Sequence, residues 1–104
     1  MNEREKAFEN KYIHDEEIKF KIYARTSKHL GLWAAKKMNI VENEATEYAK
    51  NLVDWSIDQH YDQDKLVEKL IADFNSKNIV VEETEISEEY NKLYEVSRQH
   101  IANN

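Results

Sequence analysis

Apolar side chains recur every three or four residues along four segments of this chain, the spacing that keeps them on one face of an α-helix. The pattern predicts helices over about residues 2–38 and 43–60, a third that follows an Asp62 or Asp64 cap and ends at 74, and a fourth from 83–85 to 101. Four apolar stripes on helices joined by short connections are most simply buried when the helices face a shared core. We therefore expect an all-α protein built as a small four-helix bundle.

The apolar stripe of the first segment is uneven. It is regular from Ile18 onward, whereas the residues before it are mostly polar. The apolar side chains of residues 2–16 are Ala7, Phe8, Tyr12 and Ile13. A helix that short is marginal in water without tertiary packing. We expect residues 1–17 to form a helix-prone, mobile arm that extends the first helix, and residues 18–104 to form the bundle.

The connections between the helices carry local signals. Asn43, with Glu44 and Glu47 after it, is a suitable N-cap for the second helix. Residues 79–81 are β-branched, Ile-Val-Val, but no partner strand is evident. We expect them to form an extended connector whose apolar side chains pack against the bundle.

Gly31 lies within the most regular part of the first stripe. A glycine inside a helix is about 1 kcal/mol less favourable than alanine. Gly31 therefore either lets another helix approach closely, or marks a bend, or is tolerated without a role.

The composition supports an all-α fold and narrows the chemistry. The chain has one glycine, no proline, no cysteine and 35% charged residues, so it has few residues for breaking helices or forming tight β turns. Without cysteine there is no disulfide framework and no thiolate metal site. We recognise no secretory signal, and the longest apolar run, residues 32–35, is too short to cross a membrane. We expect a cytoplasmic protein without membrane insertion.

The net charge of −6 is unevenly distributed. Residues 1–29 carry seven basic and six acidic side chains, and residues 30–104 carry eight and fifteen. Nucleic acid requires a net basic face, so we expect no nucleic-acid partner. An acidic body joined to a mixed-charge arm fits docking on a protein surface. Ordinary solvated helices would give the same imbalance.

The residues that usually carry catalysis or bind metal form no known pattern here. The four histidines occur without a His-Glu-x-x-His or Glu-x-x-His pair. The serines lack a nucleophile-elbow context, and the paired carboxylates lie in polar segments. A single glycine cannot form a phosphate-binding loop. We expect no enzyme, no metal site and no cofactor.

Two aromatic residues are unusual within the polar first segment. Phe8 and Tyr12 are four residues apart and would share one helical face. Exposed aromatic side chains among mixed charges are typical anchors for a groove on a partner protein. The alternative is that both fold back onto the bundle.

The run from Arg4 to Lys21 reads REKAFENKYIHDEEIKFK, and it is followed by AR at 24–25 and LGLWAA at 30–35. It resembles the N-terminal signature of the alphaproteobacterial zeta subunit family, the inhibitors of the F1 ATPase. The likeness continues more weakly to residue 74, through segments such as DKLVEKL at 64–70, and we take it to cover essentially the whole chain. Family members commonly have further residues before the run, including a phenylalanine, so we expect a shorter arm here.

The resemblance implies a four-helix protein whose arm becomes an ordered helix in a catalytic αβ interface of F1, next to the γ subunit, and blocks ATP hydrolysis. Such a protein would lie at the cytoplasmic side of the inner membrane when bound. The residues implied to contact F1 are Arg4, Glu5, Phe8, Lys11, Tyr12 and His14. Because ordering the arm costs entropy, the inhibition should be reversible.

A second interpretation keeps the bundle and changes its function. In it the chain is a non-inhibitory or weakly inhibitory ligand-binding module that senses adenine nucleotide with weak affinity. The residues alone mark no nucleotide pocket, and removal of the arm would separate the two interpretations.

Overall fold

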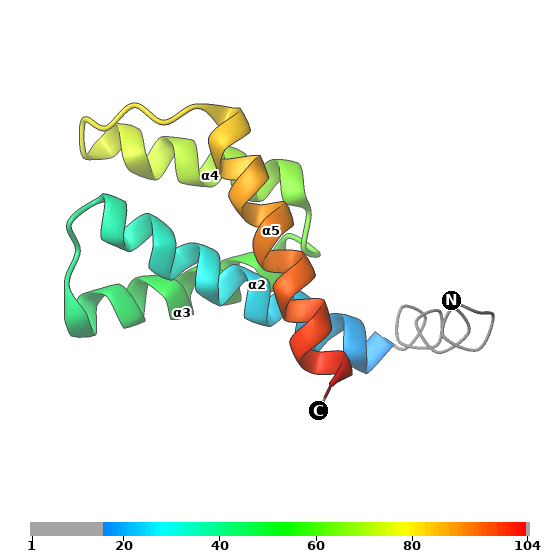
Figure 1. The fold of residues 1–104 in the computed structure, drawn as a ribbon. Helices are drawn as coiled ribbons and strands as arrows, with labels where there is room; N and C mark the ends of the chain where they lie inside the picture. The colour runs from blue at the N-terminus through cyan, green and yellow to red at the C-terminus, as the bar shows by residue number, and fades with distance from the viewer. Residues whose placement is uncertain (1–15, 104) are drawn as a thin grey trace.

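The computed structural model describes residues 16–103, which form four consecutive helices and no strand (Figure 1). These are α2 (Glu16–Lys37), α3 (Glu42–Asp58), α4 (Gln63–Ser76) and α5 (Glu83–Ala102). The expectation of an all-α, four-helix protein is confirmed. Of the predicted arm, only Glu16 and Glu17 lie within the described residues, and they begin α2.

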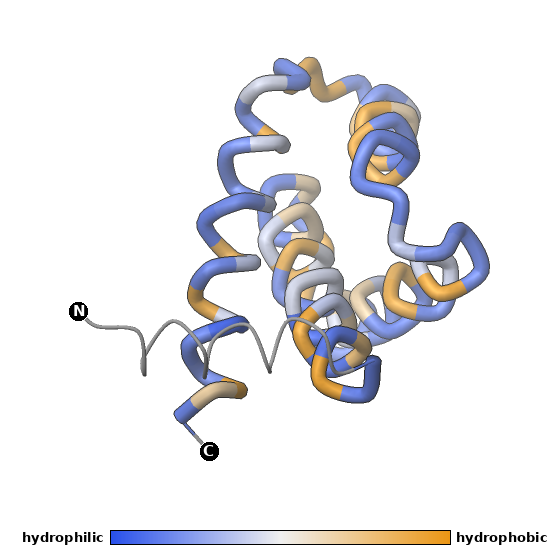
Figure 2. Tube along the Cα trace, turned by 90° about the vertical axis from the view of Figure 1, so that its right-hand side faces the viewer, coloured by the Kyte–Doolittle hydropathy of each residue, from blue (hydrophilic) through white to orange (hydrophobic). Residues whose placement is uncertain are grey.

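Helix α5 contacts both α2 and α4, and it thereby joins the α2–α3 pair to α4. Helices α2 and α3 form an antiparallel hairpin, and α5 crosses α2 (Figure 1). Helix α4 packs chiefly against the first half of α5, while α3 makes its main contact with α2. Figure 2 shows apolar positions recurring between polar ones along each helix, as the sequence pattern predicted.

The core draws one apolar face from every helix. Phe74 of α4 is fully buried, and its ring meets that of Trp33 of α2 edge to face at 6.2 Å between centroids. Burying a side chain of this size contributes roughly 2–3 kcal/mol. The buried cluster consists of Leu30, Ala34, Met38, Leu52, Leu66, Val67, Leu70, Phe74, Ile86 and Tyr90. Among the described residues no side chain before Ile22 is buried, so the core begins well inside α2.

Gly31 marks the closest contact between α2 and α3. A Cβ atom built at this glycine would lie 2.8 Å from Cα of Ala49 and 3.2 Å from its Cβ. One turn earlier, the Ser27 hydroxyl donates a hydrogen bond to Oγ of Ser56 at 3.2 Å. Because α2 continues through Gly31 as one helix, the glycine permits a close approach and does not end or interrupt the helix.

The start of α4 agrees with one of the two predicted caps. Asp62 precedes the helix, and its side chain accepts a hydrogen bond from the backbone N–H of Lys65 at 3.1 Å. Asp64 lies inside the first turn instead. The helix continues to Ser76, slightly beyond the predicted end.

The prediction of Asn43 as the N-cap of α3 is wrong. The helix begins at Glu42, and Val41, which precedes it, makes no side-chain cap hydrogen bond. The chain enters α3 through left-handed backbone at Asn39 (φ 61°) and Glu42 (φ 44°), which places Asn43 inside the first turn. The helix also ends at Asp58, earlier than predicted, because His60 and Tyr61 adopt left-handed φ values of 57° and 59°.

The connector between α4 and α5 contains no strand, as expected. Ile79 and Val81 are partly buried and pack against the core, while the Val80 side chain between them is 87% exposed. Alternation of this kind follows from an extended backbone, whose successive side chains point to opposite sides. Two of the three apolar residues therefore serve the core.

Candidate functional site

The six residues expected to contact F1, Arg4 to His14, lie outside the described residues. Their role therefore stays a prediction. The nearest described part is the N-terminal end of α2, where Phe20 is 46% exposed and its ring meets that of Tyr61 edge to face at 5.9 Å. Tyr61 in turn stacks on Tyr23 with 4.9 Å between centroids, so this end of the bundle is aromatic.

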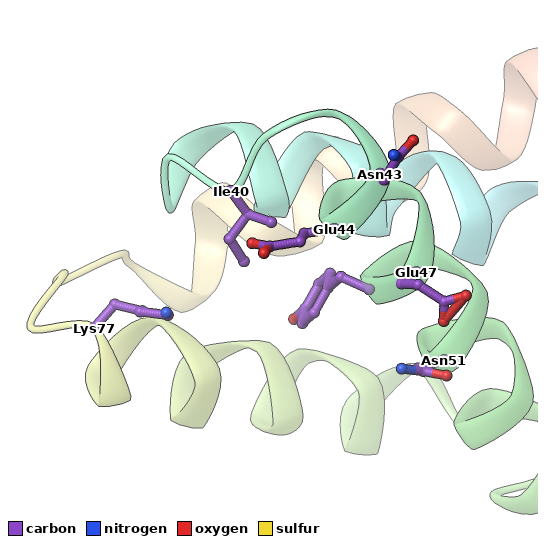
Figure 3. Close-up of a pocket in the computed structure, with 7 residues that line it drawn as sticks. Ile40, Asn43, Glu44, Glu47, Asn51 and Lys77 are labelled. Atoms are coloured by element: carbon purple, nitrogen blue, oxygen red, sulfur yellow. The ribbon is translucent and has the colours of Figure 1, made fainter.

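A cleft opens between the first half of α3 and Lys77, the residue that follows α4. Its volume is about 390 Å³, and side chains from α3, from the loop before it and from Lys77 surround it (Figure 3). It is lined by Ile40, Asn43, Glu44, Glu47, Tyr48, Asn51 and Lys77. An adjoining hollow of about 290 Å³ adds Lys69 and Asp73 of α4.

Tyr48 and Asp73 meet at the boundary of these two hollows. The Tyr48 hydroxyl donates a hydrogen bond to Oδ2 of Asp73 at 2.6 Å, and Lys69 Nζ lies 3.2 Å from the same oxygen. Burial, reinforced by the bond to Asp73, raises the pKa of Tyr48 far above its usual value. Lys69 also lies over the Trp55 ring, 5.6 Å from its centroid. The tyrosine is therefore a hydroxyl donor at neutral pH and cannot act as a base.

The charges around this cleft decide what it can bind. Three carboxylates, Glu44, Glu47 and Asp73, face two lysines, and one of these, Lys69, is already paired with Asp73. A polyphosphate requires converging cations or a row of backbone N–H groups. This lining does not favour a nucleotide's phosphates, although binding of adenine nucleotide stays an untested prediction.

The sequence carried only a faint signal for this pair. Asp73 stands between Leu70 and Phe74 on the buried side of α4, where a carboxylate needs a partner. The partner, Tyr48, is twenty-five residues away on another helix. In the sequence alone, Tyr48 looks like any other aromatic residue on an apolar helical face.

Two absences bear on the chemistry of the described residues. Within 16–103, no group of three or more His, Asp or Glu side chains is arranged to hold a metal ion. No helix in this part of the chain is both long and apolar enough to cross a membrane.

The described residues form a small helical protein with hollows on its surface. The sequence model of the family described as ATPase inhibitor subunit zeta matches residues 1–100. The chain belongs to this family, whose members are regulatory subunits and not enzymes. No curated protein and no solved structure matches the chain.

Proposed function

We propose that this chain inhibits ATP hydrolysis by the F1 sector of ATP synthase by inserting residues 1–17 into a catalytic αβ interface beside the γ subunit. The observation that carries the proposal is the extent of the family match, which includes this segment and begins at residue 1. The described core supports it, because that core starts at Ile22 and uses no side chain from 16–21.

The side chains of the arm supply the chemistry that such an interface needs. Phe8 and Tyr12 would bury apolar area in a groove. Arg4 and Lys11 would pair with carboxylates on its walls, while Glu5 and His14 would complete the polar contacts. The bundle would stay outside, at the cytoplasmic face, as a folded anchor.

The test is ATP hydrolysis by an alphaproteobacterial F1 sector, titrated with the full chain and with a Phe8→Ala/Tyr12→Ala variant. We expect the variant to inhibit at least about a hundredfold less well, since each lost aromatic anchor removes roughly 2 kcal/mol. A Val41→Ala/Val80→Ala variant is the control, because both valines are exposed in connectors. Equal inhibition by all three proteins would rule out the arm as the segment that inhibits ATP hydrolysis.

The adenine-nucleotide interpretation has its own measurement. Titration with ATP, followed by the amide NMR signals of Tyr48, Asp73 and Lys77, reports directly on the cleft between α3 and α4. Saturable shifts confined to those residues would establish a ligand site beside the inhibitory arm. Unchanged signals at millimolar ATP would remove this interpretation.

A further inference from the structure

A third hollow lies between α2 and α3. It has a volume of about 540 Å³ and is called the α2–α3 groove below. Its lining consists of Lys28, Leu32, Thr46, Ala49, Lys50, Val53 and Asp54. At 100° per residue, Lys28 and Leu32 lie nearly opposite the buried Leu30 of α2, and Lys50 and Asp54 lie nearly opposite the buried Leu52 of α3. Ala49 is itself buried and lies at the bottom of the groove.

The close approach at Gly31 explains the shape of this groove. Because Gly31 lets α2 sit directly against Ala49, the floor is made by small side chains. Leu32 and Val53 are half-buried along its sides. One turn beyond Val53, Ile57 is 37% exposed and extends the apolar strip. The groove therefore offers apolar contacts at the three- and four-residue spacing that suits another helix.

The rims of the groove are basic in a protein that is otherwise acidic. Lys28 and Lys50 are exposed on its two sides, and Asp54 is its single carboxylate. Residues 16–37 as a whole carry six basic and two acidic side chains, whereas 38–103 carry six and fifteen. An occupant that matches this surface has apolar residues on one face and carboxylates on both flanks.

We propose that the α2–α3 groove binds an acidic amphipathic helix on the surface of F1 and so fixes the bundle in place beside the arm. The proposal rests on the inhibitory function proposed above and names a second contact for it. It fits the packing of α3, whose main contact is with α2 alone. A helix laid in the groove would cover α3 from its outer side.

Two other occupants fit the groove less well. A symmetric pair of chains would bring together two grooves of the same net positive charge, and a head-to-tail pair would not close. Residues 1–15 carry three basic and four acidic side chains, so their acidic excess is a single charge, and their lysines and arginine would meet the basic rims. The experiments below distinguish a second copy and the arm from a helix of F1 as the occupant.

The experiment compares three full-length proteins in binding to the F1 sector. Lys28→Glu/Lys50→Glu reverses both rims, and Lys65→Glu/Lys92→Glu makes the same charge change at exposed lysines of α4 and α5. We expect the groove variant to bind at least about tenfold more weakly and the control to change less than about twofold. Circular dichroism checks that each is folded. Equal losses in both variants would overturn the groove and leave only a general charge effect.

A probe separates failure of the groove from failure of the inhibitory function. A synthetic helix of leucine and glutamate heptads is titrated into the full chain and followed by amide NMR. We expect shifts at Leu32, Lys50 and Val53 that are lost when lysine replaces glutamate in the peptide, whether or not F1 is inhibited. The proposal fails if both peptides act alike. It also fails if Phe8→Ala/Tyr12→Ala or dilution of the chain alone produces these shifts, because the occupant is then the arm or a second copy.

Discussion

The Tyr48 hydroxyl donates a 2.6 Å hydrogen bond to the Asp73 carboxylate, and this bond joins α3 to α4. The two helices make few other direct contacts, because α3 packs mainly on α2 and α4 mainly on α5. Lys69 holds the same carboxylate from one turn away on α4. The bond therefore closes the open side of the bundle.

Tyr48→Phe removes the donor of this bond and leaves the ring in place. A hydrogen bond to a charged group is worth roughly 1.5–3 kcal/mol. Since this site is only partly buried, we expect a loss of about 1–2 kcal/mol, or some 4–16 °C in Tm. Tyr61→Phe is the matched control, because the Tyr61 hydroxyl is buried without a hydrogen-bond partner among the described residues. Thermal melts in which Tyr61→Phe is the more damaging change would contradict this account.

His29 makes the stability of the bundle depend on pH. Burial lowers the pKa of His29, and Arg25, Lys28 and the facing His100 of α5 lower it further. The unfolded chain then binds more protons than the folded one between this lowered pKa and the ordinary value of 6.5. Stability is therefore fully present above pH 6.5 and falls as the pH drops through that window.

His29→Gln removes the titrating group from this contact. Urea titrations at several pH values from 7.5 to 5 should show a weaker decline in the free energy of unfolding for the variant than for the parent chain. Identical slopes for the parent and His29→Gln would mean that His29 contributes nothing to the pH dependence.

Gly31→Ala tests the close approach of α2 and α3. On helix propensity alone, alanine would add about 1 kcal/mol of stability. The new Cβ would lie 2.8 Å from Cα of Ala49, and backbone cannot move aside as a flexible side chain can. We expect a net loss of about 1–3 kcal/mol in denaturant unfolding. A gain in stability would show that the two helices separate at little cost.

Glu42→Gly tests strain at the start of α3. Glu42 has φ 44°, a conformation that costs a residue with a side chain about 1 kcal/mol and glycine almost nothing. We therefore expect a rise of roughly 0.5–1 kcal/mol. Glu44→Gly, two residues into the helix, should lower stability by about 1 kcal/mol instead. If the strain is real, the Tm of Glu42→Gly lies above that of the parent chain and the Tm of Glu44→Gly lies below it.

Rules that depend on residues close in sequence predicted much of this fold. They did not predict the features that depend on tertiary contacts. The apolar spacing identified four helices, and the Asp62 cap depends only on a bond to Lys65 three residues away. The entry to α3 was missed, because a left-handed Glu42 has no signature in its residue type.

Contacts between helices were harder to predict from the sequence. The sequence left Gly31 open between several roles, and only the position of Ala49 on another helix decides among them. The Tyr48–Asp73 bond left only a faint signal in the sequence for the same reason, because its two partners are on different helices. The contacts predicted for Arg4 to His14 rest on resemblance to the family, and their test requires the partner.

The separation of charge between α2 and the rest of the bundle also has a kinetic consequence. A body with six basic and two acidic side chains over residues 16–37, and an acidic excess elsewhere, carries a permanent electric dipole. Near an acidic surface, this dipole orients the chain so that α2 faces the surface before any contact forms. A larger fraction of diffusive encounters then leads to binding. Added salt, which shortens the Debye length to about 8 Å at physiological strength, slows such oriented capture more than it hastens release. The charge pattern thereby sets how fast the chain finds its target, independently of how long it stays.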